Sequence, residues 1–185
     1  MDARLRAAFA EVPRWRFLPP AQQSLAHVDA PLGIGFGVTN SQPTTVADML
    51  ALLDVRPGHT VLDVGAGSGW TTALLAHLVG PAGRVVGVER IPELTAGASD
   101  AVADWPWAAV RQADAGVLGW PRGAPYDRIL VSAMADELPD ELVDQLAADG
   151  VLVGPVAGVM LRAVRRPDGV RLTRHGWYSF VPLIR

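Results

Sequence analysis

The chain of 185 residues contains no cysteine. This absence excludes a disulfide framework and a thiolate nucleophile, and it fits a reducing compartment. Long apolar runs are missing too: no stretch of about eighteen apolar residues could cross a bilayer, and residues 1–5 lack the apolar segment of a signal peptide. We therefore expect a cytoplasmic protein that has no membrane partner.

An excess of basic residues is also absent. The formal net charge is −3, which disfavours a broad phosphate-binding surface, so we expect a protein or small-molecule substrate and no nucleic acid. The four histidines lack the spacing of metal ligands, so no metal site is expected. Half of the residues are apolar, enough for one domain with a sizeable core. We expect residues 1–185 to form that single domain and to act as a monomer.

A glycine turn between two apolar runs carries most of the functional information. Thr60 to Val64 has the β-branched composition of a buried parallel strand, and Gly65, Gly67 and Gly69 follow it directly. The absence of Cβ atoms allows a tight turn and brings main-chain amides close to a ligand. A helix is predicted over 70–79, and a second strand ends at Glu89, whose carboxylate could accept both hydroxyls of a ribose.

The spacing of these glycines favours one cofactor over another. Dinucleotide sites use G-x-G-x-x-G because a pyrophosphate lies on the helix terminus, whereas this chain has G-x-G-x-G followed by the bulky Trp70. Asp63, just before the turn, would repel phosphate but suits the ammonium or sulfonium group of S-adenosylmethionine. The sequence therefore predicts a methyl donor in preference to NAD. The alternative is a tight turn that only joins a strand to a helix.

The rest of the chain alternates between predicted strands and helices. Helices are expected over 2–10, 44–53, 92–103 and 139–146, and strands over 109–112, 127–132 and 150–155. Residues 159–165 and 169–175 are predicted to form an antiparallel hairpin. This order predicts an α/β, Rossmann-like fold with a mostly parallel central sheet, helices on both faces and a C-terminal antiparallel hairpin.

The segment from Pro13 to Pro43 lacks regular periodicity and is rich in proline and glycine. Segments of this length in compact domains are usually functional or disordered. Its apolar side chains, such as Phe17, Leu32 and Ile34, are numerous enough to hold it against a core. We expect residues 1–43 to provide an N-terminal helix and an ordered loop covering the active site, and residues 44–185 to form the α/β core.

Several motifs together resemble the protein-L-isoaspartate (D-aspartate) O-methyltransferase family over nearly the whole chain. Their order along the chain is the family's order, and they are Val12-Pro13-Arg14 with Phe17-Leu18-Pro19, Asp29 to Gly35, Thr39 to Pro43, Ala124 to Ile129, Gly154-Pro155-Val156 and Phe180 to Leu183. The resemblance implies a class I methyltransferase fold. It also implies that S-adenosyl-L-methionine, which becomes S-adenosyl-L-homocysteine, methylates the free carboxylate of an isoaspartyl residue in a protein or peptide.

The resemblance also implies roles for individual residues. Ser41 takes the catalytic position, and the substrate-binding positions around it are Thr39, Asn40, Gln42 and Pro43, of which the first two also line the donor. The cofactor-binding positions are Asp63, Gly65, Ala66, Gly67, Ser68, Gly69, Glu89, Arg90, Asp114 and Ala115. For Ser41 a structural alternative exists, because serine is favoured as the N-cap of a helix and one is expected to start nearby.

The reaction that the resemblance implies needs little acid–base chemistry. A carboxylate is already a nucleophile at neutral pH, so the rate would come from positioning and water exclusion. The chain departs from the family at Trp70, where tyrosine is usual, at Ala113-Asp114-Ala115, where Gly-Asp-Gly is common, and at His27. Two alternatives therefore stay open: a biosynthetic methyltransferase acting on an aspartate of a dedicated peptide, and a donor-binding module without catalysis.

Overall fold

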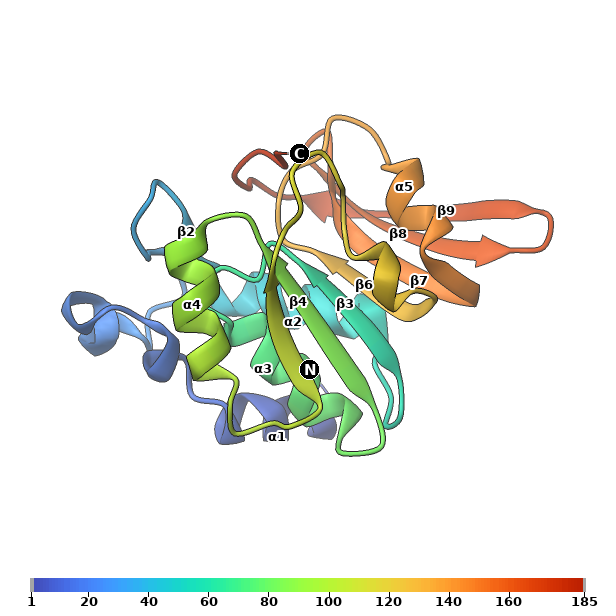
Figure 1. Cartoon of the computed structure of the whole chain (residues 1–185). Coiled ribbons are helices and arrows are strands. Elements are labelled where there is room, and N and C mark those ends of the chain that lie inside the picture. The colour runs from blue at the N-terminus through green and yellow to red at the C-terminus, as the bar shows by residue number, and fades with distance from the viewer. Residues whose placement is uncertain (1, 185) are drawn as a thin grey trace.

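The computed structural model describes residues 2–184, which fold around a seven-stranded sheet (Figure 1). The strand order is β5-β4-β3-β6-β7-β8-β9. The first five strands in this order are parallel, whereas β8 runs antiparallel to β7 and β9 antiparallel to β8. The strands are β3 (Thr60–Val64), β4 (Arg84–Glu89), β5 (Ala108–Gln112), β6 (Tyr126–Val131), β7 (Leu146–Val156), β8 (Val159–Arg166) and β9 (Gly169–Trp177). The predicted Rossmann-like sheet with a C-terminal hairpin is confirmed.

Helices cover both faces of the sheet, unequally. Because successive side chains of a strand point to opposite faces, Val61 packs among the helices of one face, while Leu62 and Val64 pack on the other. The first face carries α1 (Ala3–Glu11), α2 (Pro43–Leu53), α3 (Trp70–Val79) and α4 (Pro92–Ala101) (Figure 1). The second face is covered by the short α5 (Asp140–Asp144) and by residues around the 3-10 turn η3 (Pro121–Gly123).

Helix α3 has the predicted bounds because glycines stop it at both ends. Gly69 is left-handed at its N-cap and Gly80 has a φ of 65° at its C-cap. The prediction for α5 is wrong at its C-terminal end, since α5 stops at Asp144 and Leu146 already belongs to β7. Gln145 causes this early end: its main-chain carbonyl accepts from Tyr126 N, and its side chain bonds to Leu118 O and Trp120 N.

The N-terminal segment has more regular structure than its sequence predicts. It contains the 3-10 turns η1 (Arg14–Phe17) and η2 (Pro20–Leu25) and a two-stranded hairpin of β1 (Leu32–Gly33) and β2 (Thr39–Asn40). Leu18, Leu32 and Ile34 pack against Leu94 of α4. The segment is thus an ordered cover held by an apolar cluster of its own. Among residues 2–184, none of the helices has the length and apolar character that a bilayer crossing requires.

Candidate active site

A large cavity lies at the carboxyl ends of the parallel strands. Strands β3 and β6 are neighbours, and the chain leaves them toward opposite edges of the sheet, which is where ligands bind in open α/β folds. The cavity measures about 470 Å³. Its wall includes residues that follow four strands, namely Gly65 after β3, Arg90 after β4, Ala113 after β5 and Ser132 after β6.

The glycine turn forms one side of this cavity. Gly65, Gly67 and Gly69 have φ values of 83°, 55° and 89°, a region that strongly favours glycine. The turn is tied to the neighbouring strand, because Gly65 N and Ala66 N both donate to Val88 O. A Cβ atom on Gly69 would lie 3.2 Å from Ala98 Cβ and Ala98 O in α4. Backbone conformation therefore favours glycine at all three positions, and the close approach of α4 adds a steric reason at Gly69.

Glu89 ends β4 and joins the turn to the cavity. Its side chain is buried, Oε2 accepts from Gly67 N at 2.9 Å, and Oε1 accepts from Ile91 N at 2.9 Å. An ionised carboxylate has about four acceptor sites, so these bonds fix its orientation and leave capacity for a ligand in the cavity. This arrangement suits the pair of vicinal hydroxyls of a ribose.

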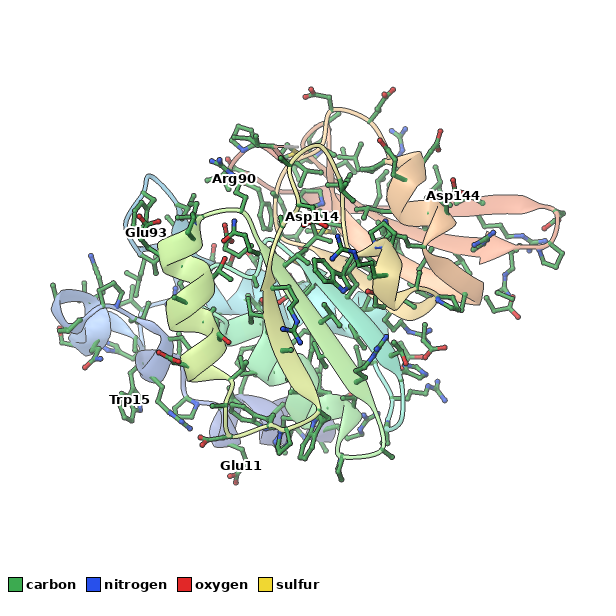
Figure 2. The ribbon with its side chains drawn as sticks, in the orientation of Figure 1. Glu11, Trp15, Arg90, Glu93, Asp114 and Asp144 are labelled. Atoms are coloured by element: carbon green, nitrogen blue, oxygen red, sulfur yellow. The ribbon has the colours of Figure 1, made fainter. Side chains whose placement is uncertain are left out.

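Arg90, Asp114 and Ala115 complete the same wall. Figure 2 shows Arg90 and Asp114 at one end of the sheet, beyond β4 and β5. Arg122 lies 2.8 Å from an Asp114 carboxylate oxygen, and its guanidinium lies 5.2 Å from the centre of the Trp120 ring. The predicted cofactor residues that follow β4 and β5 are thus brought together.

Exposed apolar side chains surround the mouth of the cavity. Phe36, Val117 and Ile184 are 59%, 39% and 50% exposed, and all three line it. Apolar surface gathered in this way commonly marks a ligand-binding groove. The C-terminal residues 181–184 belong to this wall, beside β6, through an isolated bridge between Met134 and Pro182. The last of the family motifs, Phe180 to Leu183, thus lies beside the cavity.

Two smaller hollows adjoin the large cavity, since Thr39 and Ser132 line all three. The first, of about 30 Å³, contains Asn40, Ser41, Ala66 and Ser68. The second, of about 70 Å³, contains Ser41, Gln42, Thr45 and Ser179. The predicted substrate segment therefore lies next to the predicted cofactor turn. Pro43, Asp63 and Gly69 line none of the three: Pro43 starts α2, and Gly69 is the N-cap of α3.

The N-cap alternative for Ser41 is wrong. The N-cap of α2 is Gln42, and the first turn is capped by Asp29, which accepts from Thr44 N at 2.9 Å and from Thr44 Oγ1 at 2.6 Å. Hydrogen bonds from Thr44 lower the pKa of Asp29, as expected for a capping carboxylate. Ser41 is therefore not needed to start the helix, and its place in both hollows requires another explanation.

Asp63 is fully buried under the glycine turn instead of lying in the cavity wall. Its Oδ2 accepts from Thr71 Oγ1 and Thr72 Oγ1, both at 2.7 Å, while Oδ1 has no partner. Strand alternation explains this position, because Asp63 faces α3. Burial raises the pKa of Asp63 to about 6, which outweighs the opposing effect of the two threonine hydroxyls.

This raised pKa predicts a pH-dependent stability. The folded protein holds the Asp63 proton where the unfolded chain, with an ordinary pKa of 3.8, has lost it. The stabilisation is complete below about pH 3.8 and is lost as the pH rises through about 6. We expect Asp63→Asn, which mimics the neutral acid, to gain about 2 kcal/mol in unfolding free energy relative to wild type between pH 4.5 and 7.5. Urea unfolding at both pH values measures this change. If the unfolding free energy of Asp63→Asn differs from that of wild type by the same amount at both pH values, the expectation is contradicted. Asp136→Asn, at an exposed aspartate, is the matched control.

Arg14 was missed as a site residue, although it belongs to a recognised motif. Its buried guanidinium donates to Asn40 Oδ1 at 2.7 Å and to Ser41 O at 2.9 Å. It also lies 5.4 Å from the centre of the Trp70 ring, whose Nε1 donates to Val12 O. Trp70 thus anchors the N-terminal segment to α3.

No group of three or more His, Cys, Asp or Glu side chains among residues 2–184 is arranged to hold a metal.

Comparisons with known proteins agree with this geometry. A family model described as protein-L-isoaspartate(D-aspartate) O-methyltransferase matches residues 1–185. The chain belongs to this methyltransferase family. The protein-L-isoaspartate O-methyltransferase of Methanopyrus kandleri is 46% identical over 189 residues, which cover 98% of this chain and 83% of the relative. That of Aeropyrum pernix is 46% identical over 188 residues, covering 98% and 72%.

A solved structure extends the comparison to the fold. A protein-L-isoaspartate O-methyltransferase from Plasmodium falciparum, in complex with S-adenosyl-L-homocysteine, matches with a TM-score of 0.86 and 26% identity, covering 99% of this chain and 91% of that one. Membership of the isoaspartyl methyltransferase family confirms the resemblance seen in the motifs. It also makes the large cavity the candidate methyl-donor site of this family member.

Proposed function

We propose that the protein transfers a methyl group from S-adenosyl-L-methionine to the free carboxylate of an L-isoaspartyl residue in a protein or peptide. The observation that carries this proposal is that the Glu89 cavity and the two hollows around Ser41 share Thr39 and Ser132 in their walls, which would set a nucleoside site beside an acceptor site. The family model and the curated relatives support methylation of isoaspartyl residues over the two alternatives, a dedicated biosynthetic enzyme and a silent binding module.

The donor fits the residues present. The cavity of about 470 Å³ lies within the range of cofactor sites, and Glu89 has acceptor capacity for a ribose. We assign Gly65 and Gly67 to the main-chain contacts and Arg90, Asp114 and Ala115 to the adenosine end. Asp63 does not line the cavity; it lies beneath the turn and accepts hydrogen bonds from Thr71 and Thr72 at the start of α3. When bound, the donor supplies a methyl group on a positively charged sulfur, which becomes a neutral thioether as the carboxylate oxygen takes the methyl group.

The acceptor side of the site is lined by hydroxyl groups. Ser41, Thr39, Thr45, Ser132 and Ser179 line the second hollow. Hydroxyl donors can orient a carboxylate without neutralising it, so its oxygen stays nucleophilic. In this assignment the protein aligns the acceptor and excludes water, and no side chain needs to remove a proton. We further propose that the chain works as one domain, as a monomer in the cytoplasm, without nucleic acid.

A paired-peptide assay tests the function. The protein is incubated with methyl-labelled donor and either an isoaspartyl peptide or the same peptide with ordinary aspartate. We expect base-labile methyl ester only on the isoaspartyl peptide. Equal labelling of both peptides, labelling of the aspartyl peptide alone or no labelling of either would contradict the proposal.

Ser41→Ala tests the acceptor assignment. A hydrogen bond to a charged group contributes about 1.5–3 kcal/mol, so we expect kcat/KM for the isoaspartyl peptide to fall at least about 10-fold. The melting temperature should stay at the wild-type value, because Asp29 caps α2. The matched variant Asp29→Ala should lower the melting temperature. Unchanged turnover of Ser41→Ala would contradict the assignment.

A further inference from the structure

Arg14 is a buried cation whose hydrogen bonds all go to amide oxygens. It is 5% exposed, and besides the bonds to Asn40 Oδ1 and Ser41 O it donates to Val28 O at 3.0 Å, Ala30 O at 2.8 Å and Asn40 O at 3.0 Å. Burial lowers the pKa of Arg14, and Asp29 nearby partly offsets this effect. A desolvated guanidinium is costly, so its donors hold their acceptors in a defined geometry.

These acceptors lie on both sides of the β1–β2 hairpin. Val28 and Ala30 precede the hairpin, whereas Asn40 and Ser41 end it and follow it. The guanidinium therefore closes the base of the hairpin, whose residues 36–39 line the donor cavity. Figure 1 shows the blue N-terminal segment beside α4, and η1 contacts that helix. The base of the hairpin is thus fixed to the body of the fold.

Asn40 extends this network to the glycine turn. Its Oδ1 accepts from Arg14 Nε, and its Nδ2 donates to Ser68 Oγ at 3.1 Å. The side-chain path Arg14–Asn40–Ser68 therefore links the acceptor segment at Ser41 to the turn between Gly67 and Gly69. Asn40 is buried, so both ends of its amide must be satisfied in one arrangement.

We propose that Arg14 and Asn40 are positioning residues that couple the donor site to the acceptor site, so that each bound substrate strengthens the binding of the other. This inference rests on the proposed function. Phe36 and Thr39 of the hairpin line the donor cavity, and Ser41 of the same segment lines the acceptor hollow. Both ligands therefore favour the one arrangement of this segment that Arg14 and Asn40 hold, so the ligand that binds first places the segment for the second. Such coupling is reciprocal and amounts to about 10-fold in affinity.

Calorimetry measures this coupling without turnover when S-adenosyl-L-homocysteine replaces the donor. In the wild-type protein we expect a saturating concentration of isoaspartyl peptide to tighten the binding of S-adenosyl-L-homocysteine about 10-fold. Titration of the peptide at saturating S-adenosyl-L-homocysteine should give the same factor. In Ser68→Ala, which removes only the hydroxyl that Asn40 binds, we expect the factor to fall below about 2-fold. Because the factor is a ratio with and without peptide, a direct effect of Ser68 on the cofactor cancels.

Arg14→Lys keeps the positive charge but loses the planar fork of donors. We expect it to lose the coupling and to lower kcat/KM for the peptide, while binding of the homocysteine product alone changes little. Arg16→Lys is the matched control, because Arg16 is exposed and pairs with Asp104 on the surface. It should retain wild-type coupling.

The results separate this inference from the proposed function. Absence of methyl ester on the isoaspartyl peptide would contradict the function itself. Methyl ester formation by a wild-type protein without coupling, or full coupling in Ser68→Ala, would contradict only the inference. If Arg14→Lys is unstable, Ser68→Ala alone decides, since it leaves the bonds of Arg14 intact.

Discussion

Replacing Glu89 by alanine is expected to weaken donor binding at least about 100-fold. The carboxylate is the acceptor that we assign to both ribose hydroxyls, and each hydrogen bond to a charged group contributes about 1.5–3 kcal/mol. The substitution also removes the partner of Gly67 N and Ile91 N, so the turn loses its support from β4. Calorimetric titration with S-adenosyl-L-homocysteine measures the dissociation constant directly.

A neighbouring acid provides the matched control for this prediction. Glu93 lies in the first turn of α4, is exposed and does not line the cavity (Figure 2). We expect Glu93→Ala to bind the product as the wild type does. Binding by Glu89→Ala within about 3-fold of wild type would show that the ribose is recognised elsewhere and would contradict the assignment of the donor site.

The second large effect is on folding. Gly69→Ala is expected to lower the unfolding free energy by about 2–4 kcal/mol, because alanine is strained at a φ of 89° and its Cβ meets the main chain of α4 at 3.2 Å. For a chain of this size the melting temperature should fall by about 5–10 °C. Thermal unfolding measured by circular dichroism tests this expectation.

Gly97 makes the comparison specific to the turn. It lies inside α4 with no atom within 4 Å of an added Cβ, so Gly97→Ala should raise stability by about 0.5–1 kcal/mol through helix propensity. The same chemical change is thus expected to have opposite signs at two positions. Equal effects at Gly69 and Gly97 would show that the close approach of the turn to α4 does not matter.

Local patterns were sufficient to predict the sheet and the glycine turn. The β-branched run before Gly65 and the glycines at both ends of α3 act within a few residues, so their consequences can be read from the sequence. The same holds for the antiparallel hairpin around Pro167 and Asp168. These features place Glu89 and the turn correctly because two consecutive parallel strands are adjacent in this sheet.

The proposed acceptor side could be predicted only through family motifs, because it is assembled from distant parts of the chain. Arg14 and Asn40 are separated by 26 residues, and Ser132 reaches the hollows from β6. The side chain that caps α2 comes from Asp29, 15 residues before Thr44, which is why a local rule favoured Ser41. Gln145 shortened α5 through contacts with residues 25 to 27 positions away.

Strand β9 has a consequence for how the molecule behaves at high concentration. It is one of the two edge strands of the seven-stranded sheet and is exposed along most of its length, so its outer edge could template a strand from another molecule. Natural proteins oppose such pairing with charged side chains and irregular edges. Here Arg171 and Arg174 lie in the strand, and Gly176 adopts a positive φ near its end. Like charges on two such edges repel each other, which disfavours edge-to-edge aggregation.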